Sequence, residues 1–188
     1  MRGRLFVLSG PAGVGKGTVL GRVFEKLDNI VYSVSCTTRM PRVGEIDGVN
    51  YVFMDEPSFK KMVKEDRFIE WASVHGHSYG TRKDIVERTL EEGKDVLLEI
   101  DVQGASQIKD KMPDAVMIFI QPPSFEELVR RLTNRGTEGP EELELRIRNA
   151  KTEMSHANDY EYMIINDKVE KAADDFIEIV KKYREGSI

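Results

Sequence analysis

Cysteine is almost absent from this sequence: Cys36 is the only one in 188 residues, so no intrachain disulfide can form. A single thiol is compatible with a reducing compartment. Long apolar runs are missing too, since none approaches the roughly 20 residues that a membrane helix needs. The run from Leu5 to Leu8 is too short for the core of a signal peptide and leads directly into a glycine-rich loop. We therefore expect a cytoplasmic protein that does not bind a membrane.

An excess of positive charge is also missing. The chain has 28 Lys and Arg residues against 33 Asp and Glu, a net charge of −5, so it lacks the basic field with which proteins attract nucleic acid. With 40% hydrophobic residues it does not have the composition of a disordered chain. Its length favours one domain with a substantial core.

What the sequence does contain is an alternation of apolar runs and amphipathic segments. The apolar runs predict strands at 5–9, 31–35, 96–101, 115–121 and 162–166. The amphipathic segments predict helices at 18–27, 104–112, 124–134, 143–157 and 169–183. At the start of the third of these helices, Ser124 is followed three residues on by Glu127, a capping-box pattern. Strands that are apolar throughout and alternate with helices are typical of a parallel sheet covered on both faces, so the predicted class is α/β.

Two stretches depart from this alternation. Residues 37–82 contain turns and short alternating segments, at 50–54 and 68–74, with a helix near 59–65. This stretch predicts a small, partly antiparallel insertion within the parallel fold. The run GTEGP at 136–140 places two glycines and a proline between helices, which predicts a mobile loop.

The segment GPAGVGKGT at 10–18 lies between a predicted strand and a predicted helix, the context that a phosphate-binding loop requires. Its glycines allow backbone N–H groups to surround phosphate oxygens, and the following helix adds its positive N-terminus. Lys16 supplies a charge for the β- and γ-phosphates. The usual Ser or Thr after this lysine is replaced by Gly17, so Mg²⁺ must be held mainly by phosphate and water. The alternative is a glycine-rich turn with an incidental lysine.

A second candidate phosphate site lies in the predicted insertion. Arg39 and Arg42 flank Pro41, and two guanidinium groups held close together suit a dianionic phosphate. Two arginines on a loop are more often a solvated surface. A chain that already carries a phosphate loop, however, needs an acceptor pocket if it is a kinase.

The sequence resembles the guanylate kinase family over nearly its whole length. The segments that carry the resemblance are GPAGVGKGT, SVSCTTRMPRVGEIDGVNY, FIEWASVHGHSYGT, LLEIDVQG and PPSFEELVRRLTNRGTE. It implies a P-loop three-layer fold with a five-stranded parallel core sheet, a GMP-binding insertion with a small mixed or antiparallel sheet, and a short helical lid. As a single domain, 1–188, the core would comprise 1–34, 83–123 and 158–188, the insertion about 35–82 and the lid about 124–157.

The resemblance also implies the activity, ATP + GMP to ADP + GDP with dGMP as a second substrate, in a monomer or homodimer that binds no nucleic acid. It implies a GMP-binding set of Ser35, Arg39, Arg42, Tyr51, Glu70, Tyr79, Thr81, Glu99 and Asp101. The ATP-binding set would be Gly10, Pro11, Ala12, Gly13, Val14, Gly15, Lys16, Gly17, Thr18, Arg131, Arg135 and Asn166. The catalytic set would be Lys16, Arg39, Arg131, Arg135, Arg146 and Asp101. Whether Glu99 and Arg148 contact a ligand stays open, because many relatives have aspartate where this chain has Glu99.

Physical reasoning supports guanine as the base. An ionised carboxylate is acceptor-only and can accept from N1–H and the 2-amino group of guanine at once. Glu70 could do this, while a hydroxyl of Ser35 or Thr81 donates to the 6-oxo group. Adenine reverses this edge and would leave the carboxylate facing a lone pair. The alternative for Glu70 is a solvent-facing strand residue beside Trp71.

Two further features fit a kinase. Asp101 ends an apolar strand, and ligands bind at the carboxyl ends of parallel strands; it could hold water on Mg²⁺, which we expect with ATP and without a direct protein ligand, or cap the next helix, or both. Arg131 and Arg135 share a helix face, and Arg146 follows the glycine-rich loop, as in a lid that carries positive charge to ATP. A lone helical pair of this kind usually marks a solvated face.

The acceptor phosphate is already a nucleophile at neutral pH, so the mechanism needs no general base and consists of positioning and charge neutralisation. The three histidines, His75, His77 and His156, show no metal-ligand spacing. Three other functions remain open: a kinase of AMP, dTMP or a phosphorylated sugar, a non-catalytic guanylate-kinase-like scaffold domain, and a regulatory GTPase.

Overall fold

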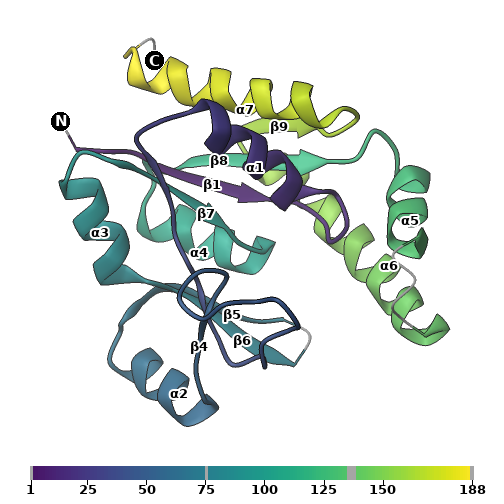
Figure 1. Cartoon of the computed structure of the whole chain (residues 1–188), viewed down its shortest axis with the longest axis horizontal. Coiled ribbons are helices and arrows are strands. Elements are labelled where there is room, and N and C mark those ends of the chain that lie inside the picture. Colours follow the sequence, from purple (N-terminus) through teal and green to yellow (C-terminus); the bar gives the residue numbers. More distant parts are fainter. Residues whose placement is uncertain (1, 75, 135–138, 187–188) are drawn as a thin grey trace. The chain divides into compact units, whose positions relative to one another are not determined.

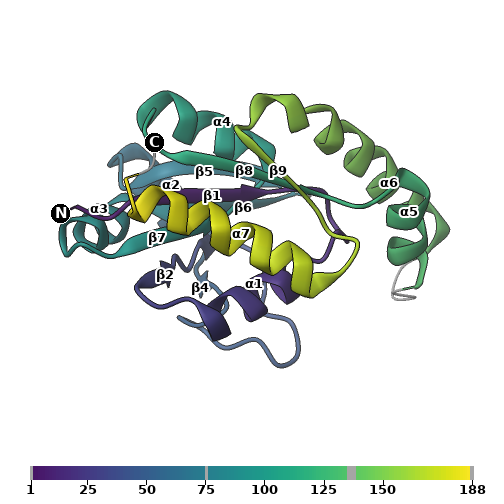
Figure 2. The same ribbon diagram turned by 90° about the horizontal axis from the view of Figure 1, so that it is seen from above.

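The computed structural model describes residues 2–74, 76–134 and 139–186 (Figures 1 and 2). The chain divides into two compact units, one formed by Met1–Val7 and Asn29–Val116 and the other by Leu8–Asp28 and Met117–Ile188. Strand β1 (Leu5–Ser9) is shared between them, and all five of its residues are buried. It is the central strand of a five-stranded sheet of order β2-β7-β1-β8-β9, which confirms the predicted parallel core sheet.

The first unit holds β2 (Ile30–Tyr32) and β7 (Asp95–Glu99), which pair in parallel, and a second sheet. The second sheet has the order β4-β3-β6-β5 and consists of β3 (Cys36–Thr37), β4 (Val52–Phe53), β5 (Phe68–Val74) and β6 (His77–Arg82). Strand β3 is parallel to β4 and antiparallel to β6, and β5 is antiparallel to β6. This mixed sheet confirms the prediction of a partly antiparallel segment.

Three helices complete this unit: α2 (Glu56–Lys64), α3 (Lys83–Glu91) and α4 (Val102–Lys111). Helix α2 has a side-chain N-cap: the carboxylate of Asp55 accepts a hydrogen bond from the N–H of Ser58 at 2.7 Å. Its one fully buried side chain, Phe59, stacks on Phe68 of β5 with ring centroids 4.6 Å apart. Together with Cys36 these rings form a small core between α2 and the second sheet.

The second unit contains α1 (Lys16–Lys26), β8 (Val116–Gln121), α5 (Phe125–Asn134), α6 (Pro140–Ser155), β9 (Tyr162–Ile165) and α7 (Val169–Arg184). Strands β8 and β9 pair in parallel. Helices α1 and α7 lie side by side in both views, and Lys26 bridges them through ion pairs with Glu170 and Asp174 at 3.0 and 2.8 Å (Figures 1 and 2).

Several predicted boundaries were wrong. Helix α6 begins at Pro140 and not at 143, because proline is well suited to the first turn of a helix, where no backbone N–H is needed. Strand β2 ends at Tyr32, before the predicted 35. Helix α3 was not predicted. Of the predicted mobile loop, residues 136–138 lie outside the described residues. The division into core, insertion and lid stays a prediction. In the part of the chain that the structure describes, no helix is long and apolar enough to span a membrane.

Candidate functional site

The phosphate-binding motif at 10–18 connects β1 to α1, in the strand–loop–helix context that the sequence predicted. Gly13 and Gly15 have φ values of +81° and +96°, a region that favours glycine. A Cβ atom at Gly15 would also lie 2.8 Å from Nδ2 of Asn166, and one at Gly13 would lie 2.7 Å from a methyl carbon of Leu132. Both glycines are therefore required by backbone conformation and by close packing.

Lys16, the first residue of α1, lies against this loop. Its Nζ donates to the carbonyl oxygens of Gly10 and Pro11 at 2.6 and 3.3 Å. The first turn of α1 contains no acidic residue, so the positive end of the helix is not neutralised locally. The arrangement places an ammonium group and a helix N-terminus at one loop, which is suited to an anion.

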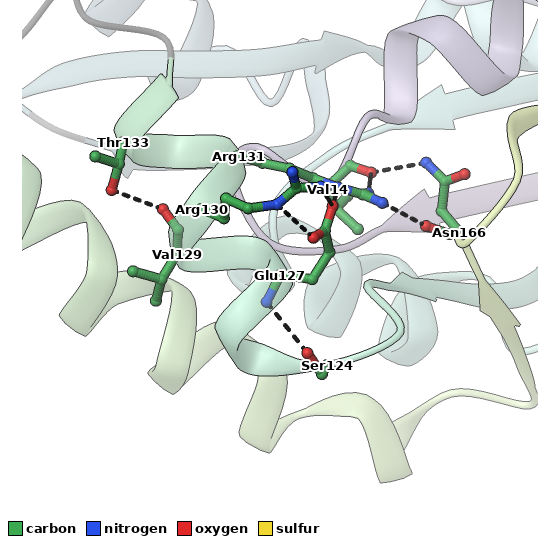
Figure 3. A network of polar contacts seen from close by, with 8 residues as sticks. All are labelled: Val14, Ser124, Glu127, Val129, Arg130, Arg131, Thr133 and Asn166. Atoms are coloured by element: carbon green, nitrogen blue, oxygen red, sulfur yellow. Dashed lines mark hydrogen bonds and ion pairs between the residues drawn. The ribbon is translucent and has the colours of Figure 1, made fainter.

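Arg131 and Asn166, both predicted to bind ATP, join the loop in one hydrogen-bond network (Figure 3). Arg131 donates to the carbonyl oxygens of Val14 at 3.2 Å and of Asn166 at 3.0 Å. The Nδ2 group of Asn166 also donates to the Val14 carbonyl, at 2.8 Å. Asn166 is 3% exposed, and its Oδ1 atom has no hydrogen-bond partner among the described residues. A buried acceptor without a partner indicates a place where a ligand can donate.

Glu127 fixes the other side of the Arg131 guanidinium. Its carboxylate accepts from Arg130 and from Arg131 at 2.8 Å each, and these hydrogen bonds hold the pKa of Glu127 far below its usual range. Ser124 accepts from the N–H of Glu127 at 3.1 Å, so this half of the predicted capping box is confirmed (Figure 3). Sequence reasoning identified Glu127 only as a capping residue and did not identify its contact with Arg131.

Helix α6 contributes a carboxylate to the loop that the sequence analysis also missed. Glu153 accepts a hydrogen bond from the backbone N–H of Ala12 at 3.1 Å. Arg146, a predicted catalytic residue, lies seven residues earlier on α6 and forms an ion pair with Glu142 at 3.7 Å. The spacing of two helical turns between Arg146 and Glu153 was the available signal. Arg135, the remaining predicted arginine, lies outside the described residues.

In the first unit the structure brings together three of the residues predicted to bind GMP. The Cζ atom of Arg39 lies 5.3 Å from the ring centroid of Tyr51, and the rings of Tyr51 and Tyr79 are 5.9 Å apart. Glu45 grips the guanidinium of Arg39 with two hydrogen bonds of 2.9 and 3.0 Å and accepts from the backbone N–H of Arg42 at 2.7 Å. Glu45, within the motif TTRMPRVGE, was not predicted.

Glu99 lies beside this cluster. The hydroxyl of Tyr32 donates to Oε2 of Glu99 at 3.4 Å. Burial raises the pKa of Tyr51, and the negative charge of Glu99 adds to the rise. The structure thus groups Glu99 with Tyr51, and it adds Tyr32, which was not predicted.

Glu70 and Thr81, predicted to read the base, are cross-strand neighbours on β5 and β6. The Thr81 hydroxyl donates to Oε1 of Glu70 at 2.5 Å. Glu70 is 3% exposed whereas Trp71 is 42% exposed, so the solvent-facing alternative was wrong. Burial raises the pKa of Glu70 to about 7, an effect that Thr81 opposes through its hydrogen bond. Asp101 raises this pKa further.

Asp101 caps α4. Its carboxylate accepts from the N–H of Gly104 at 3.1 Å and from the side-chain amide of Gln103 at 3.0 Å. The capping alternative is therefore confirmed, and the role of Asp101 toward a metal ion stays a prediction.

Ser35 is half-buried shortly before β3, and Arg42 is exposed. Of the histidines, His156 contacts Asp159 at 3.1 Å, and His75 lies outside the described residues.

Comparison with known proteins gives a consistent result. The family model described as guanylate kinase matches residues 2–183. A guanylate kinase from Thermus thermophilus is 50% identical over 187 residues, 100% of this chain and 84% of the relative. One from Clostridium perfringens is 53% identical over 171 residues, 91% and 79% of the two chains. The crystal structure of guanylate kinase from Anaplasma phagocytophilum superposes with a TM-score of 0.82 at 37% identity, covering 97% of this chain and 86% of the other.

Proposed function

The chain belongs to the guanylate kinase family and is a kinase that acts on GMP, and we propose that it transfers the γ-phosphoryl group of ATP to GMP, forming ADP and GDP. The observation that carries this proposal is the buried carboxylate of Glu70, held by the hydroxyl of Thr81. We also propose dGMP as a second acceptor, because the residues assigned to the acceptor contact the base and the phosphate, which GMP and dGMP share.

Glu70 distinguishes guanine from adenine by its hydrogen-bonding capacity. One oxygen receives the Thr81 hydroxyl and retains a second lone pair, while the other oxygen remains for a ligand. The ionised carboxylate can therefore accept both N1–H and the 2-amino group of guanine. Because the proton of Thr81 is directed at Glu70, we assign the 6-oxo group of guanine to the hydroxyl of Ser35.

Arg39 and Arg42 bind the acceptor phosphate. Glu45 orients the guanidinium of Arg39 and, through the backbone N–H of Arg42, holds the loop that carries Arg42. A guanidinium held by a carboxylate on one edge keeps its remaining N–H groups in fixed directions. Tyr51 and Tyr79 add two phenolic donors beside it.

The donor nucleotide binds at the loop 10–18. Its phosphates replace the loop carbonyls as partners of Lys16, and the 6-amino group of adenine donates to Oδ1 of Asn166, the acceptor without a partner among the described residues. GTP would present a 6-oxo group to the same acceptor, so this contact favours ATP.

The chemistry is a displacement at the γ-phosphorus by an oxygen of the acceptor phosphate. That oxygen is ionised at neutral pH, so no side chain has to remove a proton. The protein neutralises the charge that the two nucleotides bring together, with Lys16, Arg39, Arg131 and Arg146, and with Arg135 as a further proposed member.

Mg²⁺ is proposed as the metal that accompanies ATP. Position 17 carries no side chain, and an added Cβ would meet nothing within 4 Å among the described residues, so the loop has room beside the phosphates but no hydroxyl ligand there. Asp101 offers a carboxylate that can accept hydrogen bonds from water on the ion. Such an ion, held by phosphate oxygens and water, would offset negative charge on the γ-phosphoryl group.

A coupled assay of ADP production with GMP, dGMP, AMP and dTMP tests the proposal. We expect turnover with GMP and dGMP and a rate at least about 100-fold lower with AMP, because adenine leaves Glu70 facing a lone pair. Comparable rates with AMP and GMP would refute the assignment of the base site. Adding GDP and ADP and following ATP formation measures the reverse direction.

A further inference from the structure

A residue of α4 that no motif assigns to chemistry lies against the carboxylate of Glu70. Gly104 is the third residue of α4 and is buried. A Cβ atom built on it would overlap Oε2 of Glu70 and lie 3.1 Å from its Cδ atom. The same Cβ would lie 3.4 Å from Oδ1 of Asp101. The carboxylate occupies the space that any larger residue at 104 would fill.

Glu70 has little freedom to avoid such an overlap. It is 3% exposed, and its other oxygen receives the Thr81 hydroxyl at 2.5 Å. Moving Oε2 away from residue 104 would rotate the carboxylate about this hydrogen bond. The orientation of the two oxygens, and hence the direction of their lone pairs, therefore depends on the absence of a side chain at Gly104.

Two long side chains of α4 hold the strand backbone on either side of Glu70 at a set distance from the helix. Among the described residues, strand β5 is at the edge of its sheet, so one row of its backbone groups pairs with no other described strand. Gln107 accepts from the N–H of Trp71 at 3.2 Å and donates to its carbonyl at 2.6 Å. Lys111 donates to the carbonyl of Ile69 at 2.7 Å. These contacts fasten α4 to the residues on both sides of Glu70.

Gly104, Gln107 and Lys111 are spaced by three and four residues and so share one face of α4. We propose that this face is a positioning surface for guanine specificity, in which Gly104 sets the orientation of the Glu70 carboxylate and the other two residues set its distance. The inference rests on the proposed function, because it assigns a consequence to the base-reading role of Glu70. Gly104 acts through Glu70 and is not a catalytic residue.

The variant Gly104→Ala tests this surface. We expect the KM for GMP to rise roughly 10- to 100-fold, as for the loss of one charge-assisted hydrogen bond, with the KM for ATP unchanged. The preference for GMP over IMP, which lacks the 2-amino group, should fall by a similar factor. A merely structural role would not change this ratio. The matched control is Gly21→Ala on α1, where an added Cβ meets nothing within 4 Å among the described residues; it should leave both values unchanged.

Repeating the substitution in a Glu70→Asp background tests whether overlap with Oε2 of Glu70 causes the change in the GMP:IMP ratio. Glu70→Asp shortens the side chain by one methylene and withdraws the carboxylate from residue 104. Adding Gly104→Ala to Glu70→Asp should therefore change the GMP:IMP ratio by less than about twofold, well below its effect in the wild-type background. An equal effect in both backgrounds would overturn the proposal, as would an unchanged ratio in the single variant.

A variant that keeps Gly104 covers the case in which Gly104→Ala does not fold. Gln107→Met removes both hydrogen bonds to the Trp71 backbone, and we expect it to narrow the GMP:IMP ratio several-fold; a wild-type ratio in this variant would contradict the proposal. The wild-type rates with GMP and AMP test the proposed function separately. If the wild type prefers GMP to AMP but the variants keep the wild-type GMP:IMP ratio, only the proposed role of the α4 face is overturned.

Discussion

Replacing Glu70 by glutamine should remove a large part of the pH dependence of GMP binding. Burial raises the pKa of this carboxyl group to about 7. Guanine offers two donors, so it binds the ionised form and cannot bind the protonated form in the same way. GMP affinity should consequently increase as the pH rises through 7, and GMP binding near pH 7 should release a proton from Glu70.

The size of the effect follows from the ionised fraction. With a pKa of about 7, about 3% of Glu70 is ionised at pH 5.5 and about 90% at pH 8, so this group alone changes the GMP dissociation constant about 30-fold. The phosphate of GMP contributes separately, because its second ionisation lies near pH 6; over the same range its dianion fraction changes about fourfold. The two effects together give roughly 100-fold for the wild type.

Titration calorimetry with GMP at pH 5.5 and pH 8 separates these contributions. Glu70→Gln retains the phosphate effect and should show only about a fourfold change. It should also bind GMP roughly 10- to 100-fold more weakly than wild type at pH 8, because an amide NH₂ replaces one acceptor. A variant with the full wild-type pH dependence would show that Glu70 does not titrate against GMP, and the base-site argument would fail.

The same pKa makes a second, ligand-free measurement informative. In the unfolded chain Glu70 has its ordinary pKa of 4.5, so between pH 4.5 and about 7 the folded protein retains a proton that the unfolded chain has released. Rising pH in this window therefore lowers the free energy of unfolding, by at most about 3 kcal/mol. In denaturant unfolding, the Glu70→Gln variant should show no such decrease with pH. Its free energy of unfolding at pH 8 should be higher than that of the wild type.

Other predictions concern the phosphate sites and the donor base. Lys16→Ala should abolish turnover with little effect on GMP affinity, as measured by single-turnover kinetics and GMP titration; near-normal activity would disprove the assignment of the loop. Glu45→Gln should raise the KM for GMP about tenfold and leave the KM for ATP unchanged, because Arg39 loses one charged partner; a rise in both values would indicate a general structural role instead. Asn166→Ala should reduce the preference for ATP over GTP about tenfold in steady-state assays with both donors, and an unchanged preference would place the adenine elsewhere.

The parts of the fold that were predicted from sequence are those whose signal is local. The run Leu5–Leu8 is apolar, all of Leu5–Ser9 is buried, and the loop motif after it identifies the strand–loop–helix unit. Helix α3 had no comparable signal. It has no side-chain cap at Arg82, and only two of its side chains, Val86 and Leu90, are buried in a segment that is otherwise mostly charged. It packs against β7, β5 and β6, which the sequence of α3 alone does not indicate.

The residues that motifs identify are mainly those expected to touch ligands, whereas the residues that hold them were missed. Glu153 reaches the N–H of Ala12 across 141 positions of sequence, and Glu127 reaches Arg131 across four. In sequence both glutamates are ordinary polar residues of amphipathic helices. An acidic residue on a helix is usually solvated, so neither the capping-box position of Glu127 nor the seven-residue spacing of Glu153 from Arg146 was enough to predict these contacts.

Gly104 shows why such residues cannot be found from local preferences. By helix propensity a glycine inside α4 is a defect, less favourable than alanine by roughly 1 kcal/mol. In the structure the missing side chain at 104 leaves the space that Oε2 of Glu70 occupies. If the glycine is present for this reason, Gly104→Ala should gain its helical stabilisation only after Glu70 has been shortened to aspartate. In the wild-type background the overlap should cancel the gain, so thermal unfolding of the four variants in this cycle would reveal a coupling that neither residue shows alone.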